Sequence, residues 1–220
     1  MPSARIWITK RGMEIKKILV TGFEPYCDYH VNSSWVVAEK VAALSVDGAI
    51  VAVEQMPVSF GHAGIALRGA VEKHSPDAII MLGQSGGSDK VKLERVALNM
   101  MDAKQADNDG YVPTEEPINH DAPATLFTNM PIKSLCVAVE EQGIPAKISN
   151  SCGLYVCNRL YYEALMICKE QPQMQAIFVH LPFYMGHPSA KIGKPTMQLS
   201  QMVRAIEIII EEHNDKNRKV

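Results

Sequence analysis

No stretch of this sequence is suited to crossing a membrane, and neither sign of charge dominates it. None of the apolar runs in the 220 residues approaches the roughly 20 residues that a membrane-spanning helix needs. The 22 Lys and Arg residues are interspersed with 24 Asp and Glu residues, which leaves a formal net charge of -2. The sequence therefore lacks the basic surface that binds nucleic acid or an anionic membrane, and we expect neither as a partner.

The sequence also lacks the cysteine patterns of zinc sites and of secreted, disulfide-linked proteins. Its 5 cysteines are an odd number, and their spacing matches no zinc motif. The first dozen residues are basic but contain no apolar segment of the kind found in secretory signals. These absences favour a cytoplasmic protein with five free thiols and no metal site.

What the sequence does contain is an alternation of apolar strands with amphipathic helices, which predicts an α/β fold with a parallel or mixed sheet covered on both faces. The length suits a single domain, which we place at residues 15–213, between an N-terminal extension (1–14) and a charged tail (214–220). The expected strands are residues 15–23, 49–53, 78–82, 91–101, 146–149 and 176–181. The expected helices carry residues 35–44, 65–71, 132–142, 157–170 and 196–212.

One long segment breaks this alternation. Residues 102–131 are rich in Asn, Asp and Pro and have little hydrophobic periodicity. Long loops in a domain of this kind are often functional, so we interpret the segment as a partly ordered excursion that contributes to a site.

The chemistry is expected at residues 149–158, where a polar loop turns into an apolar helix and places Cys157 near the first turn of that helix. Unpaired N–H groups and the helix dipole favour a thiolate at such a position, so Cys157 is a candidate nucleophile. The competing interpretation is that Cys157 only fills the helix–sheet interface, as buried cysteines often do. Cys152, which lies close to the helix start, is a second candidate thiol.

His180 is the candidate base. A helix from residue 157 to about 170 descends roughly 20 Å, and the strand that follows regains about 16 Å by His180. His180 should therefore return to the level of Cys157, at the edge of the sheet where α/β proteins hold ligands. Alternatively, His180 is a hydrogen-bonded core residue. The other six histidines are expected at the surface.

A Cys–His pair usually needs a third group that orients the imidazole. Glu94 is the most attractive acid because it follows a glycine-rich loop and is flanked by apolar residues. An ion pair with Arg95 or Lys92 would explain Glu94 equally well, so the residue types alone do not decide its role.

The glycine-rich loop suggests a different enzyme class. Residues 83–87 fit the G-x-S-x-G pattern of serine hydrolases, with Ser85 as the nucleophile. That nucleophile elbow requires a strand, a sharp turn and then a helix, whereas the residues from 91 onward are expected to be extended. We regard a serine hydrolase as the alternative function.

Taken together, these motifs resemble one family of cysteine peptidases, pyroglutamyl peptidase I, also called pyrrolidone-carboxylate peptidase. The resemblance extends from about residue 17 to residue 209. It rests on several motifs in the same order, at residues 21–26, 32–35, 83–87, 94–99, 107–110, 149–158 and 179–183.

The resemblance implies hydrolysis of the bond after an N-terminal pyroglutamyl residue of a peptide. By position, it implies that Cys157 is the nucleophile, His180 the general base and Glu94 the orienting acid. It also implies a single α/β/α domain, commonly a homotetramer, with no metal or organic cofactor. The pocket for the lactam ring maps to Phe23, Tyr26, Gln84, Tyr155 and Val156.

The sequence departs from the family pattern outside the triad. Cys27 and Asp28 stand where two glycines are usual, Ser88 where arginine is common, and Lys104 where arginine is frequent. Such changes could reshape the entrance of the pocket or weaken the binding of substrate. A third hypothesis is therefore a catalytically silent binder of pyroglutamyl peptides.

Overall fold

Six strands form one mixed sheet at the centre of the protein. The computed structural model describes residues 15–191 and 193–216. The strand order is β2-β1-β3-β8-β4-β7, in which β2, β1, β3 and β8 are parallel and β4 and β7 run the opposite way. The strands are β1 (Lys16–Phe23), β2 (Ala49–Met56), β3 (Ala78–Gln84), β4 (Val91–Glu94), β7 (Ala146–Ser149) and β8 (Gln175–Leu181).

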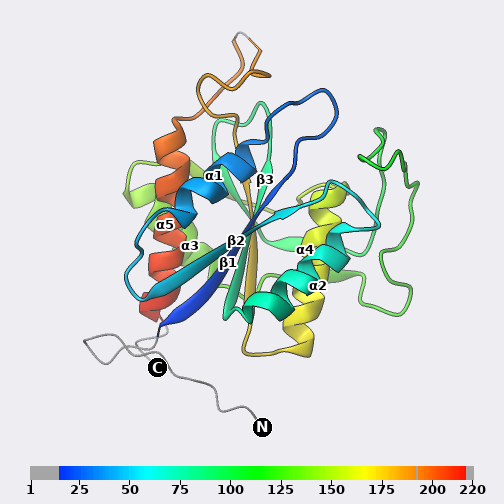
Figure 1. Ribbon diagram of the computed structural model, residues 1–220, viewed down its shortest axis with the longest axis horizontal. Coiled ribbons are helices and arrows are strands. Elements are labelled where there is room, and N and C mark those ends of the chain that lie inside the picture. Colours follow the sequence, from blue (N-terminus) through cyan, green and yellow to red (C-terminus); the bar gives the residue numbers. More distant parts are fainter. Residues whose placement is uncertain (1–14, 192, 217–220) are drawn as a thin grey trace.

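Helices cover both faces of this sheet (Figure 1). One face is covered by α1 (Ser33–Ala42), α3 (Ile132–Glu141) and α5 (Leu199–Lys216), and the other by α2 (Ala63–His74) and α4 (Val156–Glu170). The predicted α/β/α sandwich with a mixed, mostly parallel sheet is therefore confirmed. Both faces must be buried in such a fold, which is why β3 is buried along its whole length and is apolar from Ala78 to Leu82.

Local signals set the ends of the first two helices. Asn32 caps α1, because its side chain accepts a hydrogen bond from the Ser34 backbone N–H at 3.1 Å. The α2 helix ends at Ser75, whose φ of 46° is left-handed and whose successor is Pro76. Both ends lie where the sequence predicts them.

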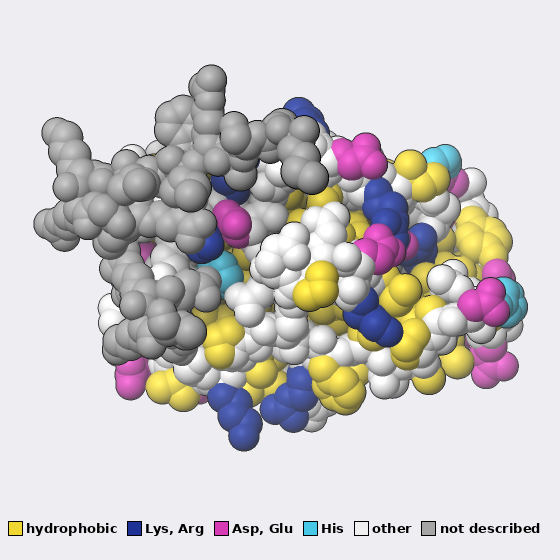
Figure 2. Space-filling view, turned by 90° about the horizontal axis from the view of Figure 1, so that it is seen from below, with side chains coloured by type: hydrophobic (Ala, Val, Ile, Leu, Met, Phe, Trp, Pro, Cys, Tyr) yellow, Lys and Arg dark blue, Asp and Glu magenta, His cyan; other side chains and the backbone are white. Residues whose placement is uncertain are grey.

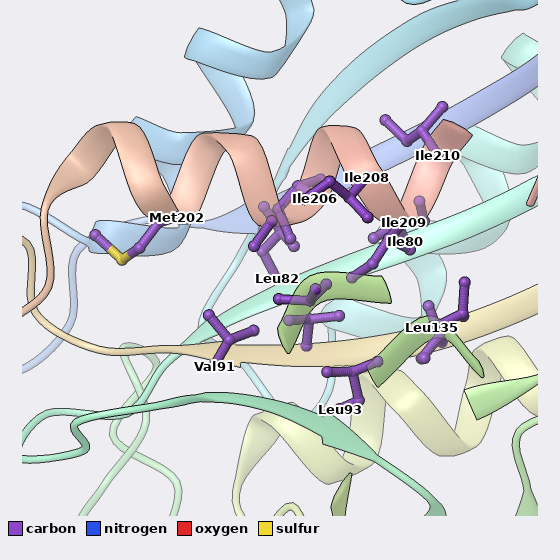
Figure 3. Close-up of a cluster of buried hydrophobic side chains, with 14 of the residues drawn as sticks. Ile80, Leu82, Val91, Leu93, Leu135, Met202, Ile206, Ile208, Ile209 and Ile210 are labelled. Atoms are coloured by element: carbon purple, nitrogen blue, oxygen red, sulfur yellow. The ribbon is translucent and has the colours of Figure 1, made fainter. Parts of the chain in front are cut away.

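The hydrophobic core has two layers, because alternate residues of each strand face opposite sides of the sheet. In the layer under α5, Ile206 and Ile209 point toward Ile80 and Leu82 of β3 (Figure 3). The other layer packs α2 and α4 against the opposite face of the same strands. The sheet is thereby held between two well-buried layers, and its carboxyl edge offers a rigid platform.

The structure corrects the expected strand at residues 91–101. It is interrupted at Arg95, so that β4 belongs to the main sheet while β5 (Val96–Leu98) pairs with β6 (Thr125–Phe127) in a separate two-stranded sheet. The excursion over residues 102–131 therefore contributes a strand of its own. The imperfect alternation in the sequence reflects this change of partner.

The histidines and the chain ends also differ in part from expectation. His187 and His213 are buried rather than at the surface. The α5 helix continues to Lys216, so it includes the start of the expected tail at 214–220. The expected extension at 1–14 lies outside the described residues.

On the face seen in Figure 2, acidic and basic side chains are intermixed with apolar ones wherever described residues are visible. Among the described residues, no helix combines the length and the apolar character needed to cross a membrane.

The packing of α5 yields a stability prediction. Replacing the fully buried Ile209 by alanine leaves a cavity, and we expect the free energy of unfolding to fall by about 2 to 5 kcal/mol. Urea denaturation measures this loss. Ile65→Ala in α2 is the control, because Ile65 is 69% exposed and its truncation should change stability by no more than about 0.5 kcal/mol. Equal losses in both variants would contradict the assignment of this core.

Candidate active site

Cys157 is the second residue of α4, as the sequence predicts. The chain enters this helix through Gly153, which has a φ of 81°, and Tyr155, the extended N-cap residue. Within the described residues, the backbone N–H groups of Val156 and Cys157 donate no hydrogen bond, as is usual in the first helical turn. The Cys157 thiol is partly exposed and lies at this electropositive helix end.

His180 lies near the end of β8, on the same face of the sheet as α4. Its neighbour across the strand pair is Gly83 of β3. A Cβ atom at position 83 would lie 2.7 Å from the ring of Phe178 and 2.9 Å from the ring of His180. Glycine is therefore required here for both rings to fit, and the Phe178 ring in turn packs 4.8 Å from the imidazole, centroid to centroid.

Glu94 is the partner of His180. Its Oε1 lies 2.8 Å from His180 Nδ1, and the carboxylate is almost fully buried, with 1% of the side chain exposed. The Glu94 backbone carbonyl accepts a hydrogen bond from the Tyr161 hydroxyl at 2.9 Å, which ties the end of β4 to α4. The alternative ion pair with Lys92 is absent from the described residues, because that ammonium group donates to Ser85 instead.

These contacts determine the charge state of the imidazole. Burial lowers the pKa of His180, but hydrogen bonds to Cys157 and Glu94 and the attraction of their negative charges outweigh it and raise the pKa to about 9. The imidazolium form is therefore favoured at neutral pH. A cysteine beside a cationic histidine is an arrangement that enzymes use for nucleophilic catalysis.

The argument that the helix and the following strand bring Cys157 and His180 to the same level is correct for α4 and β8, but the strand before α4 runs in an unexpected direction. The α4 helix and β8 do return the chain to the same level, because the two side chains interact. The strand before the helix does not run as expected, since β7 is parallel to β4 and β4 is antiparallel to β8. Residues 150–155 therefore carry the chain back to the carboxyl edge of β8 before α4 begins.

A small cavity opens beside Cys157. It encloses about 280 Å³ of empty space, part of which is open to solvent. All five residues expected in the lactam pocket line it, together with the thiol and two residues that sequence reasoning missed, Asn32 and Val58. Asn32 belongs to the motif at residues 32–35 but was not assigned to the pocket, and Val58 carries no sequence signal because it follows a strand in an irregular segment.

Loops distant in sequence hold the cavity walls in place. Glu24 accepts hydrogen bonds from the Val58 backbone N–H at 2.9 Å and from the Asn108 side chain at 2.8 Å. The Tyr155 hydroxyl donates to the Ala106 carbonyl at 2.8 Å. The excursion at residues 102–131 thus braces the site, in line with the role expected for it.

Gln84 supplies a polar group to the otherwise largely apolar cavity. Its Oε1 accepts a hydrogen bond from the Ser33 backbone N–H at 2.7 Å. Its Nε2 is buried and has no hydrogen-bond partner among the described residues. An unpaired buried donor is costly unless a ligand satisfies it, so this amide is poised to donate to a carbonyl oxygen in the cavity.

Cys152 differs from Cys157 in its surroundings. Cys152, the second candidate thiol, is buried and is the less exposed of the two. Burial, together with the nearby Cys157 and Glu94, raises its pKa well above the ordinary value. Among the described residues, no group of three or more His, Cys, Asp or Glu side chains is placed to hold a metal ion.

Two of the other sequence-level features have a structural explanation. Ser85 follows β3 but leads through a turn into β4, so the helix that a nucleophile elbow requires is missing. Cys27, which stands where the family resemblance predicts a glycine, adopts a left-handed φ of 53°. A glycine would adopt this backbone conformation at a lower steric cost.

Comparisons with known proteins agree with one another. The model of the family described as pyroglutamyl peptidase matches residues 16–216. The pyrrolidone-carboxylate peptidase of Bacillus subtilis is 39% identical over 196 residues, which cover 88% of this chain and 90% of that protein. The pyroglutamyl peptidase I structure from Bacillus amyloliquefaciens is 34% identical with a TM-score of 0.86, covering 91% of this chain and 97% of that one. The pyrrolidone carboxyl peptidase structure from Thermococcus litoralis is 33% identical with a TM-score of 0.88, covering 93% and 96%.

The His180 environment makes a testable prediction about pH. Removing the charge of Glu94 with Glu94→Gln removes a stabiliser of the imidazolium, so the pKa of His180 should fall below its value of about 9. NMR titration of the imidazole measures this shift. Because the folded pKa lies above the ordinary 6.5, the stability contributed by protonated His180 is present below pH 6.5 and lost as pH rises through about 9. Glu72→Gln, at an exposed position of α2, should leave the titration unchanged.

Proposed function

The chain belongs to the pyroglutamyl peptidase family, and we propose that it is a cysteine peptidase that removes an N-terminal pyroglutamyl residue from peptides. One observation carries this proposal. A small, largely apolar cavity ends at a partly exposed thiol, whose histidine partner is held by a buried carboxylate. In the proposed triad, Cys157 is the nucleophile, His180 the acid–base group and Glu94 the orienting acid.

The cavity selects the pyroglutamyl ring by shape and by a few hydrogen bonds. The ring is a flat, neutral lactam, so an apolar slot formed by Phe23, Tyr26, Val58 and Tyr155 can bind it without a charged residue. The unpaired Gln84 amide donates to the lactam carbonyl oxygen. A peptide with a charged N-terminal ammonium group is rejected, because no carboxylate lines the cavity among the described residues.

Acylation begins with the Cys157 thiolate and the His180 imidazolium. The sulfur attacks the carbonyl carbon that joins pyroglutamate to the next residue, and the negative charge moves to the carbonyl oxygen. The free N–H groups of Val156 and Cys157 stabilise that oxygen. As the intermediate collapses, the C–N bond breaks, His180 gives its proton to the leaving amine, and a thioester remains on Cys157.

Water then releases the product. His180, now neutral, takes a proton from a water molecule, whose oxygen attacks the thioester carbon. The C–S bond breaks, free pyroglutamate leaves, and the thiolate–imidazolium pair is restored. Throughout, Glu94 accepts the hydrogen bond from Nδ1 and so keeps Nε2 directed toward the thiol and the substrate.

The reaction as proposed needs no cofactor. A homotetramer, implied by the family resemblance, and a cytoplasmic location, favoured by the cysteine content, stay predictions.

Substitutions in the triad test the proposed activity. Cys157→Ala and His180→Ala should each reduce the release of naphthylamine from pyroglutamyl-naphthylamide by more than about a thousandfold. Ser85→Ala should remain active, and iodoacetamide should inhibit the wild type by alkylating Cys157 before Cys152. Circular dichroism verifies that each variant is folded.

Two other outcomes would favour the alternative functions. Activity that survives Cys157→Ala but not Ser85→Ala would indicate a serine hydrolase. Binding of the substrate by the folded wild type without turnover would indicate a silent binder.

The role of Gln84 has its own test. Gln84→Glu keeps an oxygen for the Ser33 N–H but replaces the lactam donor with a carboxylate. We expect KM for pyroglutamyl-naphthylamide to rise about tenfold or more, because an unpaired buried polar group costs about 1 to 3 kcal/mol. Steady-state kinetics measures this change. Gln142→Glu, on the exposed end of α3, is the matched control, and an equal rise in both variants would refute the assignment.

A further inference from the structure

Lys92 lies beside the catalytic histidine and has no part in the mechanism above. In the antiparallel pairing of β4 with β8, Lys92 is directly opposite His180. Residues directly opposite each other in such a pair point to the same face of the sheet, so Lys92 shares the face of His180 and Glu94. Its side chain reaches across the end of β8, where Nζ lies 2.9 Å from Ser85 Oγ.

The ammonium group of Lys92 is half-buried, yet it has no counter-charge among the described residues. Its hydrogen-bond partner is a neutral hydroxyl, and the nearest carboxylate of the triad, Glu94, is engaged by His180. Lys147 of β7, the next residue across the sheet, is a second lysine and adds to the positive potential. A partly desolvated cation in this position is a favourable site for an anionic group of a ligand.

The geometry of the site indicates which part of the substrate meets this cation. The cavity for the ring is built at the ends of β1 and β3 and at the start of α4. Lys92 comes from β4, on the other side of β8. The scissile bond must lie between them, at Cys157 and His180, so the leaving residue extends toward Lys92.

We propose that Lys92, held by Ser85, binds a carboxylate on the residue that follows pyroglutamate. The α-carboxylate of that residue is only two bonds from the nitrogen that His180 protonates, so an ammonium group next to His180 is within reach. An acidic side chain on the same residue offers the same chemistry. This specificity role rests on the proposed peptidase function and makes pyroglutamyl dipeptides, or peptides with an acidic second residue, the preferred substrates.

Matched substrate pairs separate the two carboxylates. Pyroglutamyl-alanine against pyroglutamyl-alanine amide tests the α-carboxylate, and pyroglutamyl-glutamate amide against pyroglutamyl-glutamine amide tests the side chain. We expect the wild type to favour the acid over its neutral partner by about tenfold in kcat/KM in at least one pair, mainly through KM, and less so at high salt.

Variants at position 92 assign the preference to Lys92. In Lys92→Met the ratio within each pair should fall to about one, while Lys92→Arg should retain it and Lys133→Met, on the opposite face of the sheet, should not change it. Because each ratio compares two substrates of the same variant, a general loss of activity or stability cancels out. No preference in the wild type, or the same preference in Lys92→Met, would overturn the proposal.

Binding separates this proposal from the peptidase function itself. Calorimetry on the Cys157→Ala variant gives Kd for each acid and its amide without turnover. Tighter binding of the acid that disappears in the Cys157→Ala, Lys92→Met double variant supports the role of Lys92 even if the wild type hydrolyses nothing. Equal affinities for acid and amide would refute that role even if hydrolysis is observed.

Discussion

The contact between Glu94 and His180 is the interaction on which the site depends. A carboxylate this deeply buried is tolerated only with a partner, and the imidazole 2.8 Å away is that partner. The two residues are far apart in sequence and come from strands of opposite direction. The direction of β4, which together with β7 runs opposite to the other four strands, is what brings the acid to the histidine. The same contact raises the pKa of His180 and so links the topology of the sheet to the chemistry of the thiol.

The residues around Glu94 and His180 act mainly through packing, because some leave room for neighbouring rings and others fill the space between them. Gly83 leaves room for the rings of Phe178 and His180, and Tyr161 packs against Phe178 while its hydroxyl holds the Glu94 carbonyl. Such packing restricts the imidazole to one orientation, as its proposed acid–base role requires. The cavity is built in a different way, because the ends of β1 and β3 and the start of α4 are completed by loops that side-chain hydrogen bonds hold in place. Packing in the core therefore positions Glu94 and His180, whereas hydrogen bonds position the walls of the cavity.

Outside the proposed triad, the sequence departs from the pattern that its resemblance to the family predicts. At one such position, Cys27 has a left-handed φ of 53°, a conformation that costs a cysteine more than a glycine. Separately, Ser85 and Lys92 form a polar pair beside His180. Neither feature takes part in bond breaking as proposed, and the polar pair bears instead on the proposed selectivity for the leaving residue.

The sequence by itself determined the α/β class, most helix and strand positions, and the order of motifs that identifies the family, because hydrophobic periodicity and capping residues are local signals. It also indicated Cys157 through its place at a helix start. It left Glu94 open between orienting His180 and an ion pair with Arg95 or Lys92, and it missed Val58 and the break at Arg95. Only the tertiary structure decided these points, because strand direction, the burial of Cys152 and the convergence of loops on one cavity depend on contacts between distant segments. The pairing of Lys92 with Ser85 belongs with them, since a lysine in a short strand carries no sign of the neighbour it meets across the sheet.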